Sequence, residues 1–124
     1  MRRERPGAGS SLVVVHAHTD AADVLSLVGE LDMAAAPRFV SQAADALRAG
    51  ARRLFVELEG VSFVDSAGLA ALLNVLRRAT ACRARLVLVG AQPQIRAVLA
   101  QTRIDREFTF AATVEDAEDV SGAN

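Results

Sequence analysis

The sequence predicts an α/β domain whose mixed, mostly parallel sheet has an antiparallel edge strand. The chain has 124 residues, 52% of them hydrophobic, which suits a single domain with its own core. Short β-branched runs alternate with segments of helical periodicity in the order β-β-α-β-α-β-α-β-α. The run Leu86-Val87-Leu88-Val89 has the continuous apolar character of a strand buried on both faces. Together these three observations predict the fold class.

The first elements predict an antiparallel hairpin. Residues 1–11 lack periodicity and predict a flexible leader before a single domain over residues 12–120. Leu12 to His18 predicts a strand with three consecutive valines. Residues 19–23 predict a turn, and Val24 to Gly29 predicts the second strand.

The middle of the chain predicts a third strand with one helix before it and one helix after it. Pro37 to Ala49 places its apolar residues on one helical face. Arg53 to Leu58 predicts the third strand, and a loop is expected to follow it through Val64. Asp65-Ser66 then begins an apolar helix that runs to about Thr80.

The last third of the chain continues the alternation after the buried strand. Pro93 suits the first turn of the next helix, where a missing N–H does no harm. Glu107 to Ala111 predicts a short last strand. Thr113, with Asp116 three residues later, resembles a capping box and predicts a short acidic helix. Residues 121–124 predict a frayed tail.

Charge and composition argue against several classes of function. The 14 basic and 15 acidic residues give a net charge of -1, which argues against a basic nucleic-acid-binding face and polybasic membrane attachment. No segment approaches the ~18 consecutive apolar residues of a transmembrane helix. Cys82, as the single cysteine, cannot form an internal disulfide or a zinc framework. We therefore expect a reduced, cytoplasmic location and no metal.

The segment Asp65-Ser66-Ala67-Gly68-Leu69 is the most informative stretch of the sequence. Asp65 or Ser66 can cap the free N–H groups of a helix start. Gly68 costs about 1 kcal/mol relative to alanine in a helix, which suggests that another group approaches closely there. A phosphate on Ser66 would be stabilised by the helix start and would add about -1.5 to -2 charges.

The helix that follows this segment is predicted to have two different faces. Its leucines cluster at 100° per residue and should face the core: Leu69, Leu72, Leu73 and Leu76. The opposite face is small and nearly flat, and is a candidate partner-binding surface: Ala67, Ala71, Asn74 and Arg78. The alternative is an ordinary exposed face filled with good helix formers, and periodicity alone favours that interpretation.

A second candidate stretch, Gly29-Glu30-Leu31-Asp32, ends the second strand just before the first helix. Strand ends and helix starts gather at one edge of a parallel sheet, where ligands and partners bind. Asp32 could therefore lie near Ser66, although 33 residues separate them along the chain. The alternative is that Asp32 only closes a turn.

Together these stretches carry a family resemblance. Val28-Gly29-Glu30-Leu31-Asp32, followed by Val61-Ser62-Phe63-Val64-Asp65-Ser66-Ala67-Gly68-Leu69, resembles a STAS domain and, more closely, the bacterial anti-sigma factor antagonists. The resemblance covers about residues 12–118. It implies the STAS fold.

The resemblance also implies a phosphorylation switch. Ser66 would be phosphorylated by a serine kinase that is also the anti-sigma factor. The unphosphorylated antagonist binds this kinase and frees the sigma factor, the phosphorylated form lets go, and a phosphatase resets it. Asp32 matches an aspartate near the phosphorylation site, and Asp65 and Gly68 match the frame of the serine loop. The chain would be no enzyme, hold no cofactor, and contact neither DNA nor a membrane.

Three residues depart from the family pattern. Ala35 stands where Thr or Ser is usual, which removes a helix cap worth ~1 kcal/mol. Glu57 replaces Asp or Asn in the third strand, and Ala67 follows Ser66 in place of Ser or Thr.

Two other functions and one other site compete with this interpretation. The same serine motif would suit the STAS subunit of a lipid-transport ABC complex that docks on the transporter ATPase. A small hydrolase built around Ser66 is disfavoured, because the chain lacks a Gly-x-Ser-x-Gly elbow. His16 and His18 share one strand face, but no third metal ligand is identifiable, and an exposed edge strand explains both.

Overall fold

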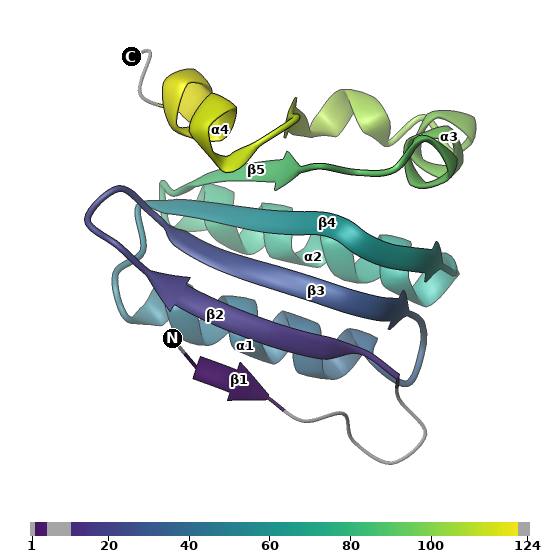
Figure 1. The fold of residues 1–124 in the computed structure, drawn as a ribbon, viewed down its shortest axis with the longest axis horizontal. Helices are drawn as coiled ribbons and strands as arrows, with labels where there is room; N and C mark the ends of the chain where they lie inside the picture. Colours follow the sequence, from purple (N-terminus) through teal and green to yellow (C-terminus); the bar gives the residue numbers. More distant parts are fainter. Residues whose placement is uncertain (1, 5–10, 122–124) are drawn as a thin grey trace.

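The computed structural model describes residues 2–4 and 11–121, which form one sheet with helices on both of its faces (Figure 1). The strands are β1 (Arg2–Glu4), β2 (Val13–His18), β3 (Asp23–Leu31), β4 (Arg53–Val64), β5 (Arg85–Val89) and β6 (Thr109–Ala111). The helices are α1 (Ala36–Arg48), α2 (Ser66–Ala81), α3 (Pro93–Gln101) and α4 (Val114–Ser121), with a 3₁₀ turn over Asp105–Glu107. No helix in the described ranges is long and apolar enough to cross a membrane.

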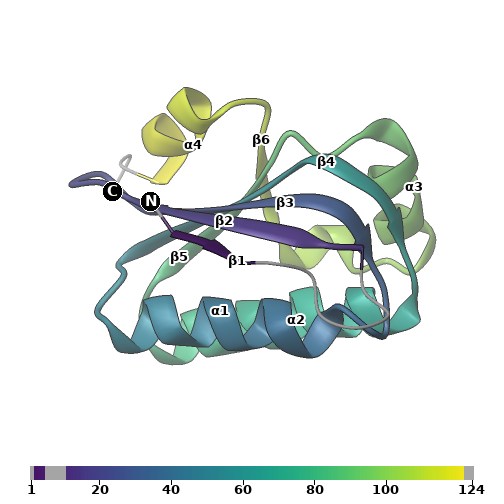
Figure 2. The ribbon, with the colours of Figure 1, turned by 60° about the horizontal axis from the view of Figure 1, so that its bottom comes forward.

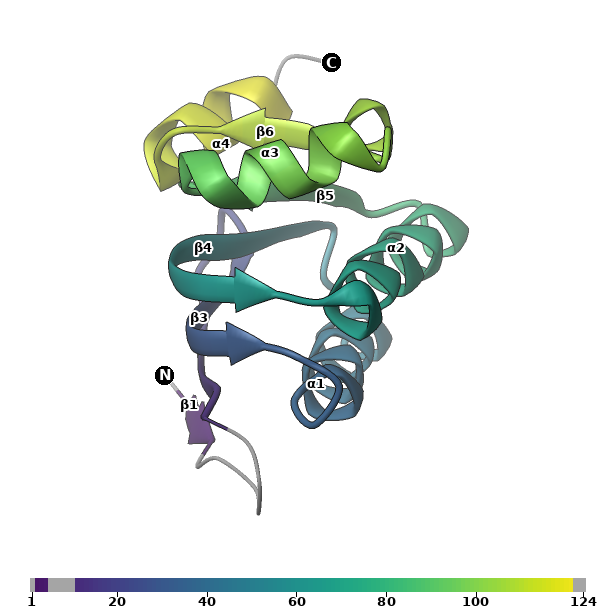
Figure 3. The same cartoon turned by 90° about the vertical axis from the view of Figure 1, so that its right-hand side faces the viewer.

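The sheet follows the chain order β1-β2-β3-β4-β5-β6. β1, β2 and β3 pair antiparallel, whereas β3, β4, β5 and β6 pair parallel. The prediction of a mostly parallel sheet with an antiparallel edge is therefore confirmed. Because each parallel connection carries a helix, β3 and β4 end side by side, and α1 and α2 begin at the same edge (Figure 3).

The sheet divides the core into two apolar clusters, one on each of its faces. α1 and α2 lie side by side beneath one face of the sheet, and α4 covers part of the other (Figure 2). Leu86 and Leu88 of β5 pack into the larger cluster, on the α1–α2 side. Val87 and Val89 pack into the smaller one, with Ala117 of α4. The continuous apolar run of β5 is thus buried on both faces, as its sequence predicts.

The ends of the chain differ in part from the prediction. Residues 2–4 form strand β1, which pairs with β2, so they are not part of a flexible leader and β2 is not an edge strand. Ser121 ends α4 and does not belong to a frayed tail. Residues 1, 5–10 and 122–124 of the predicted leader and tail lie outside the described residues.

Two strand boundaries were also predicted wrongly. β4 does not stop at Leu58, because residues through Val64 stay paired to β3 across two irregularities in the register. Glu59-Gly60 has the composition of a turn, yet Gly60 pairs with Val28 of β3 just after the first irregularity, so the strand continues. β6 begins at Thr109, because the preceding residues form the 3₁₀ turn.

The buried face of α2 is rotated relative to the prediction. Its buried residues are Gly68, Ala71, Leu72, Val75 and Ala79, whereas Leu69, Leu73 and Leu76 are only partly buried. α1 packs beside α2, so the inward face must serve both the sheet and a neighbouring helix. Small residues suit that double contact. The prediction that Ala71 lies on the outer face is therefore wrong, while Asn74 and Arg78 are exposed as predicted.

Because of this rotation, substituting two adjacent leucines by alanine should lower the free energy of unfolding by different amounts. Leu72→Ala should lower the free energy of unfolding by about 2–5 kcal/mol, because its side chain is fully buried. Leu73→Ala should cost roughly half as much or less, because its side chain keeps some contact with water. Urea unfolding of both variants measures the difference, and equal costs would contradict the observed face.

Candidate functional site

The candidate site lies where the loop after β3 meets the loop after β4, at the carboxyl edge of the parallel strands. The backbone N–H of Asp65 donates to the carbonyl oxygen of Leu31 at 3.4 Å, across the ends of the two strands. The backbone N–H of Met33 donates to Oδ2 of Asp65 at 3.0 Å. Residues far apart in the sequence are thereby joined, as the parallel topology predicts.

Asp65 holds this edge together with a single carboxylate. Its backbone is extended, and it is the N-cap of α2. Oδ1 accepts from the N–H of Gly68 at 2.9 Å, so one oxygen closes the first turn of the helix. Oδ2 accepts from Met33, so the other oxygen ties that helix to the loop entering α1. Of the two predicted cap candidates, Asp65 performs the capping.

Ser66 is the first residue of α2 and is exposed to solvent. The cap leaves its hydroxyl free of the capping role, and no hydrogen bond of that hydroxyl occurs within residues 2–4 and 11–121. The residue stands at the positive end of a helix of 16 residues. Its hydroxyl is therefore on the surface, close to the positive end of the helix.

Gly68 permits the close approach that brings α2 against the end of β3. A Cβ at this position would lie 2.1 Å from the carbonyl oxygen of Leu31 and 2.9 Å from Cγ1 of Val64. The first contact is with backbone, which cannot move aside without shifting the strand. The suggestion that another backbone approaches this glycine is thus confirmed.

Asp32 closes the turn into α1. Its Oδ1 accepts from the N–H of Ala35 at 3.0 Å, and its carbonyl oxygen accepts from Ala36 at 2.8 Å. These bonds support the structural interpretation of this aspartate. The same bonds place it one residue from Met33 and hence next to the Asp65 bridge.

Two features compensate for the absence of a capping hydroxyl at Ala35. The residue is the N-cap of α1 and makes no side-chain cap. Asp32 supplies the local hydrogen bonds instead, and the Ala35 methyl group is fully buried in the larger core cluster. The departure from the family pattern therefore exchanges a polar cap for apolar packing.

The candidate partner-binding residues on α2 lie beside α1. A groove of about 400 Å³ is lined by Pro37 and Val40 of α1 together with Ala67, Ala70 and Asn74 of α2. Ala71 lies in its floor and is buried. Asn74 accepts through Oδ1 from Nε of Arg78 at 2.7 Å, which links the two polar members of the set.

Sequence reasoning missed Met33 and the α1 side of this groove. Met33 is 75% exposed, although its backbone is fixed by Asp65. A large apolar residue in a turn between two motifs was the available signal. Pro37 and Val40 carried no such signal, because a helical pattern does not say which neighbouring helix a flanking residue borders.

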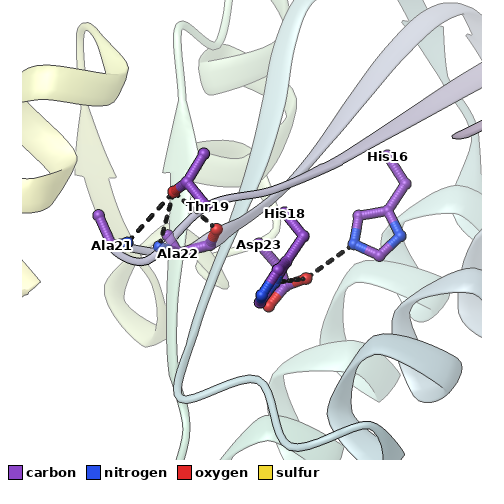
Figure 4. Close-up of polar contacts among 6 residues, drawn as sticks. All are labelled: His16, His18, Thr19, Ala21, Ala22 and Asp23. Carbon is purple, nitrogen blue, oxygen red and sulfur yellow. Dashed lines mark hydrogen bonds and ion pairs between the residues drawn. The ribbon is translucent and has the colours of Figure 1, made fainter. Parts of the chain in front are cut away.

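The two histidines lie at the opposite end of the sheet. Nε2 of His16 and Nδ1 of His18 contact the same Oδ1 of Asp23, at 2.8 and 3.0 Å (Figure 4). Thr19 closes the adjoining turn through the N–H groups of Ala21 and Ala22. β1 pairs with β2 only as far as His16, so the expected exposed edge holds for His18, whose side chain is 74% exposed, and not for His16.

Comparisons with known proteins show the family and the fold. The family model described as the STAS domain matches residues 14–117. An anti-sigma factor antagonist from Mycobacterium paratuberculosis has a similar structure, with a TM-score of 0.81 and 24% identity over 90% of this chain and 95% of that chain. No curated protein matches the chain closely enough to serve as a relative.

The fold of this chain is also similar to that of one further protein in both its unphosphorylated and its phosphorylated form. The unphosphorylated form of the anti-sigma factor antagonist SpoIIAA gives a TM-score of 0.70 with 24% identity, over 90% of this chain and 99% of that chain. The phosphorylated form of SpoIIAA, described as a Bacillus cell fate determinant, gives 0.67 with 26% identity, over 86% and 98%.

The Asp65 bridge predicts a graded series of variants. Asp65→Ala should lower the free energy of unfolding by about 2 kcal/mol, since it removes a helix cap and a second hydrogen bond. Asp65→Ser can still cap α2 but is too short to reach Met33, so it should cost about 1 kcal/mol. Chemical denaturation compares them, and equal losses would show that the bridge adds nothing to the cap.

Gly68→Ala tests the close approach independently. Its methyl group would collide with the Leu31 carbonyl, so the start of α2 must move away from β3. We expect a loss of stability despite the higher helix propensity of alanine. Amide exchange should quicken at Met33 and Asp65, and unchanged protection there would contradict the prediction.

Proposed function

The chain belongs to the STAS domain family, and we propose that it is an anti-sigma factor antagonist switched by phosphorylation of Ser66. Unphosphorylated, it would bind a serine kinase that is also an anti-sigma factor and so release the sigma factor. Phosphorylated, it would dissociate, and a phosphatase would reset it. The exposed Ser66 hydroxyl, at the first position of a helix capped by its neighbour, is the observation that carries the proposal.

The different roles of Asp65 and Ser66 at the start of α2 support phosphorylation of the serine. In many helices a serine at this point is needed as a cap, and modifying it would disturb the fold. Here Asp65 caps α2, so Ser66 can gain a phosphate without loss of that hydrogen bond. The phosphate would also face the positive end of the helix. The proposed switch therefore changes the charge of a surface and keeps its frame.

A phosphate would oppose binding through charge and desolvation. It adds about -1.5 to -2 charges at a point that a partner must cover closely. Ala67, Asn74 and Arg78 extend the proposed contact surface along α2 from Ser66, and the buried Ala71 supports it from below. Small side chains keep this surface low, so a partner would approach the serine without obstruction.

We propose that Asp32, Asp65 and Gly68 position this surface. Asp32 shapes the turn into α1, Asp65 bridges the two loops, and Gly68 sets the distance between α2 and β3. Asp32, at the rim, is the one of the three placed to touch the kinase as well.

The chain would be a substrate and not an enzyme. A nucleophilic serine needs a base within hydrogen-bond reach. The two histidines lie at the other end of the sheet, bonded to Asp23. ATP and the catalytic groups would come from the kinase, and the effect on transcription would need no contact with DNA.

Paired Ser66 variants used as baits in native lysate test the proposal. Ser66→Ala should retain a kinase-type anti-sigma factor, because it cannot be phosphorylated. Ser66→Asp should lose it, because a fixed carboxylate imitates part of the phosphate charge. Retained proteins are identified by mass spectrometry, with Ala97→Asp on exposed α3 as the control for an added charge elsewhere.

Two outcomes would contradict the proposal. If both Ser66 baits retain the kinase equally, the charge switch is wrong. If both retain a transporter ATPase, the domain is a fixed subunit of a transport complex. Incubating the wild type with the captured kinase and ATP should place the phosphate on Ser66 and leave Ser66→Ala unmodified.

A further inference from the structure

A groove runs along the outer side of the α1–α2 pair for most of the length of the two helices. Its first part is the 400 Å³ hollow beside Val40 and Ala70. A second hollow of about 240 Å³ follows, lined by Ala44, Leu47 and Ala81 among others. From Pro37 to Leu47 this groove extends about 15 Å at 1.5 Å per residue. We call it the α1–α2 groove.

The lining of the α1–α2 groove is apolar and low. Ala, Val, Leu and Pro side chains form most of its floor and walls. Asn74 is the polar residue of the first hollow, and Arg48, Arg78 and Cys82 border the second. The lining positions recur every three or four residues on both helices. A surface of this shape matches an amphipathic helix, whose own apolar side chains also recur every three or four residues.

The charges at the two ends of the groove differ in sign. Asp32 and Asp65 lie at the end where both helices begin. At the far end Arg48, Arg77 and Arg78 are exposed, and Asp45 pairs with Arg48 and offsets one positive charge. Each helix end contributes only about half a charge of the opposite sign, so the side chains set the balance.

A second copy of the chain fits this groove poorly. The apolar residues that are exposed along the α2 side of the groove, Ala70 and Ala81, are short. Two copies facing each other would bring hollow against hollow, with no long apolar side chain to fill either. The occupant must therefore supply larger apolar side chains than this chain offers there.

We infer that the α1–α2 groove binds an amphipathic helix of the protein partner. That helix presents leucine-sized side chains to the two hollows, basic residues beside Asp32 and Asp65, and acidic residues beside the arginines of the far end. The inference rests on the proposed function for the identity of the partner as the kinase. It extends the binding surface from the neighbourhood of Ser66 to α1 and to the far ends of both helices.

Binding of designed peptides to the full chain tests the groove proposal in the absence of the kinase. The probe is a helix of about 14 residues with leucines at three- and four-residue spacing, lysines at one end and glutamates at the other. One control replaces its charged residues by glutamine, and another scrambles the same composition. We expect the probe to bind about tenfold more tightly than the scrambled peptide, with the uncharged peptide between them. Amide chemical shifts should change at Val40, Ala44 and Ala70.

One variant links the groove to the partner. Val40→Glu places a carboxylate in the first hollow and should lower the affinity for the probe peptide about tenfold. Introduced into the Ser66→Ala bait, it should also abolish capture of the kinase. Ala97→Glu, an equivalent change on exposed α3, should do neither. Circular dichroism and thermal unfolding establish that both variants are folded.

The outcomes separate the two proposals. Three results would each contradict the proposal that the groove binds a partner helix. They are equal binding of the scrambled peptide, chemical-shift changes outside the α1–α2 groove, and a concentration-dependent dimer that buries the groove. If Val40→Glu is folded and still captures the kinase, the groove proposal fails while the proposed function stands. If the Ser66→Ala bait captures no kinase although the probe binds the groove, the proposed function fails instead.

Discussion

The bridge made by the Asp65 carboxylate is the interaction on which the rest of the site depends. One oxygen closes the first turn of α2, and the other holds the loop that leads into α1. Two loops separated by about thirty residues thus become one surface. Because each oxygen accepts from a backbone N–H, the bridge fixes main chain on both sides and leaves neighbouring side chains free. Met33 and Ser66 are both exposed next to it.

Close packing makes this edge rigid as well as connected. Gly68 brings α2 against the end of β3, and the buried Ala35 and Ala71 let α1 and α2 pack on the sheet and on each other. A surface held in this way can change its charge and keep its shape. That property suits a protein whose binding is controlled by adding and removing one phosphate. The same small residues leave the shallow groove between the helices, so the packing that steadies the serine also shapes the neighbouring surface.

Much of the candidate site could be predicted from the sequence, because its parts have local causes. A helix cap at Asp65 or Ser66, the glycine in the first helical turn and the aspartate that follows β3 are marked by residue type and spacing. What could not be predicted depends on neighbours. Periodicity gives α2 an apolar face but not its rotation, since α1 as well as the sheet decides which residues are covered, and so Ala71 was placed on the wrong side. Met33 and Val40 were missed for the same reason.

The sequence by itself determined the fold class, the order of strands and helices, and the position of Ser66 at the start of α2. These follow from apolar periodicity and capping chemistry, which act over a few residues. Only the tertiary structure decided where pairing overrides local preference. The Glu59-Gly60 pair stays in β4 because β3 lies alongside it, and residues 2–4 form a strand because β2 offers a free edge. It also decided that Asp65, and not Ser66, caps α2, and that the second oxygen of the same carboxylate reaches a distant loop. Contacts between segments far apart in the chain have no local sequence signal, so they appear only once the chain is folded.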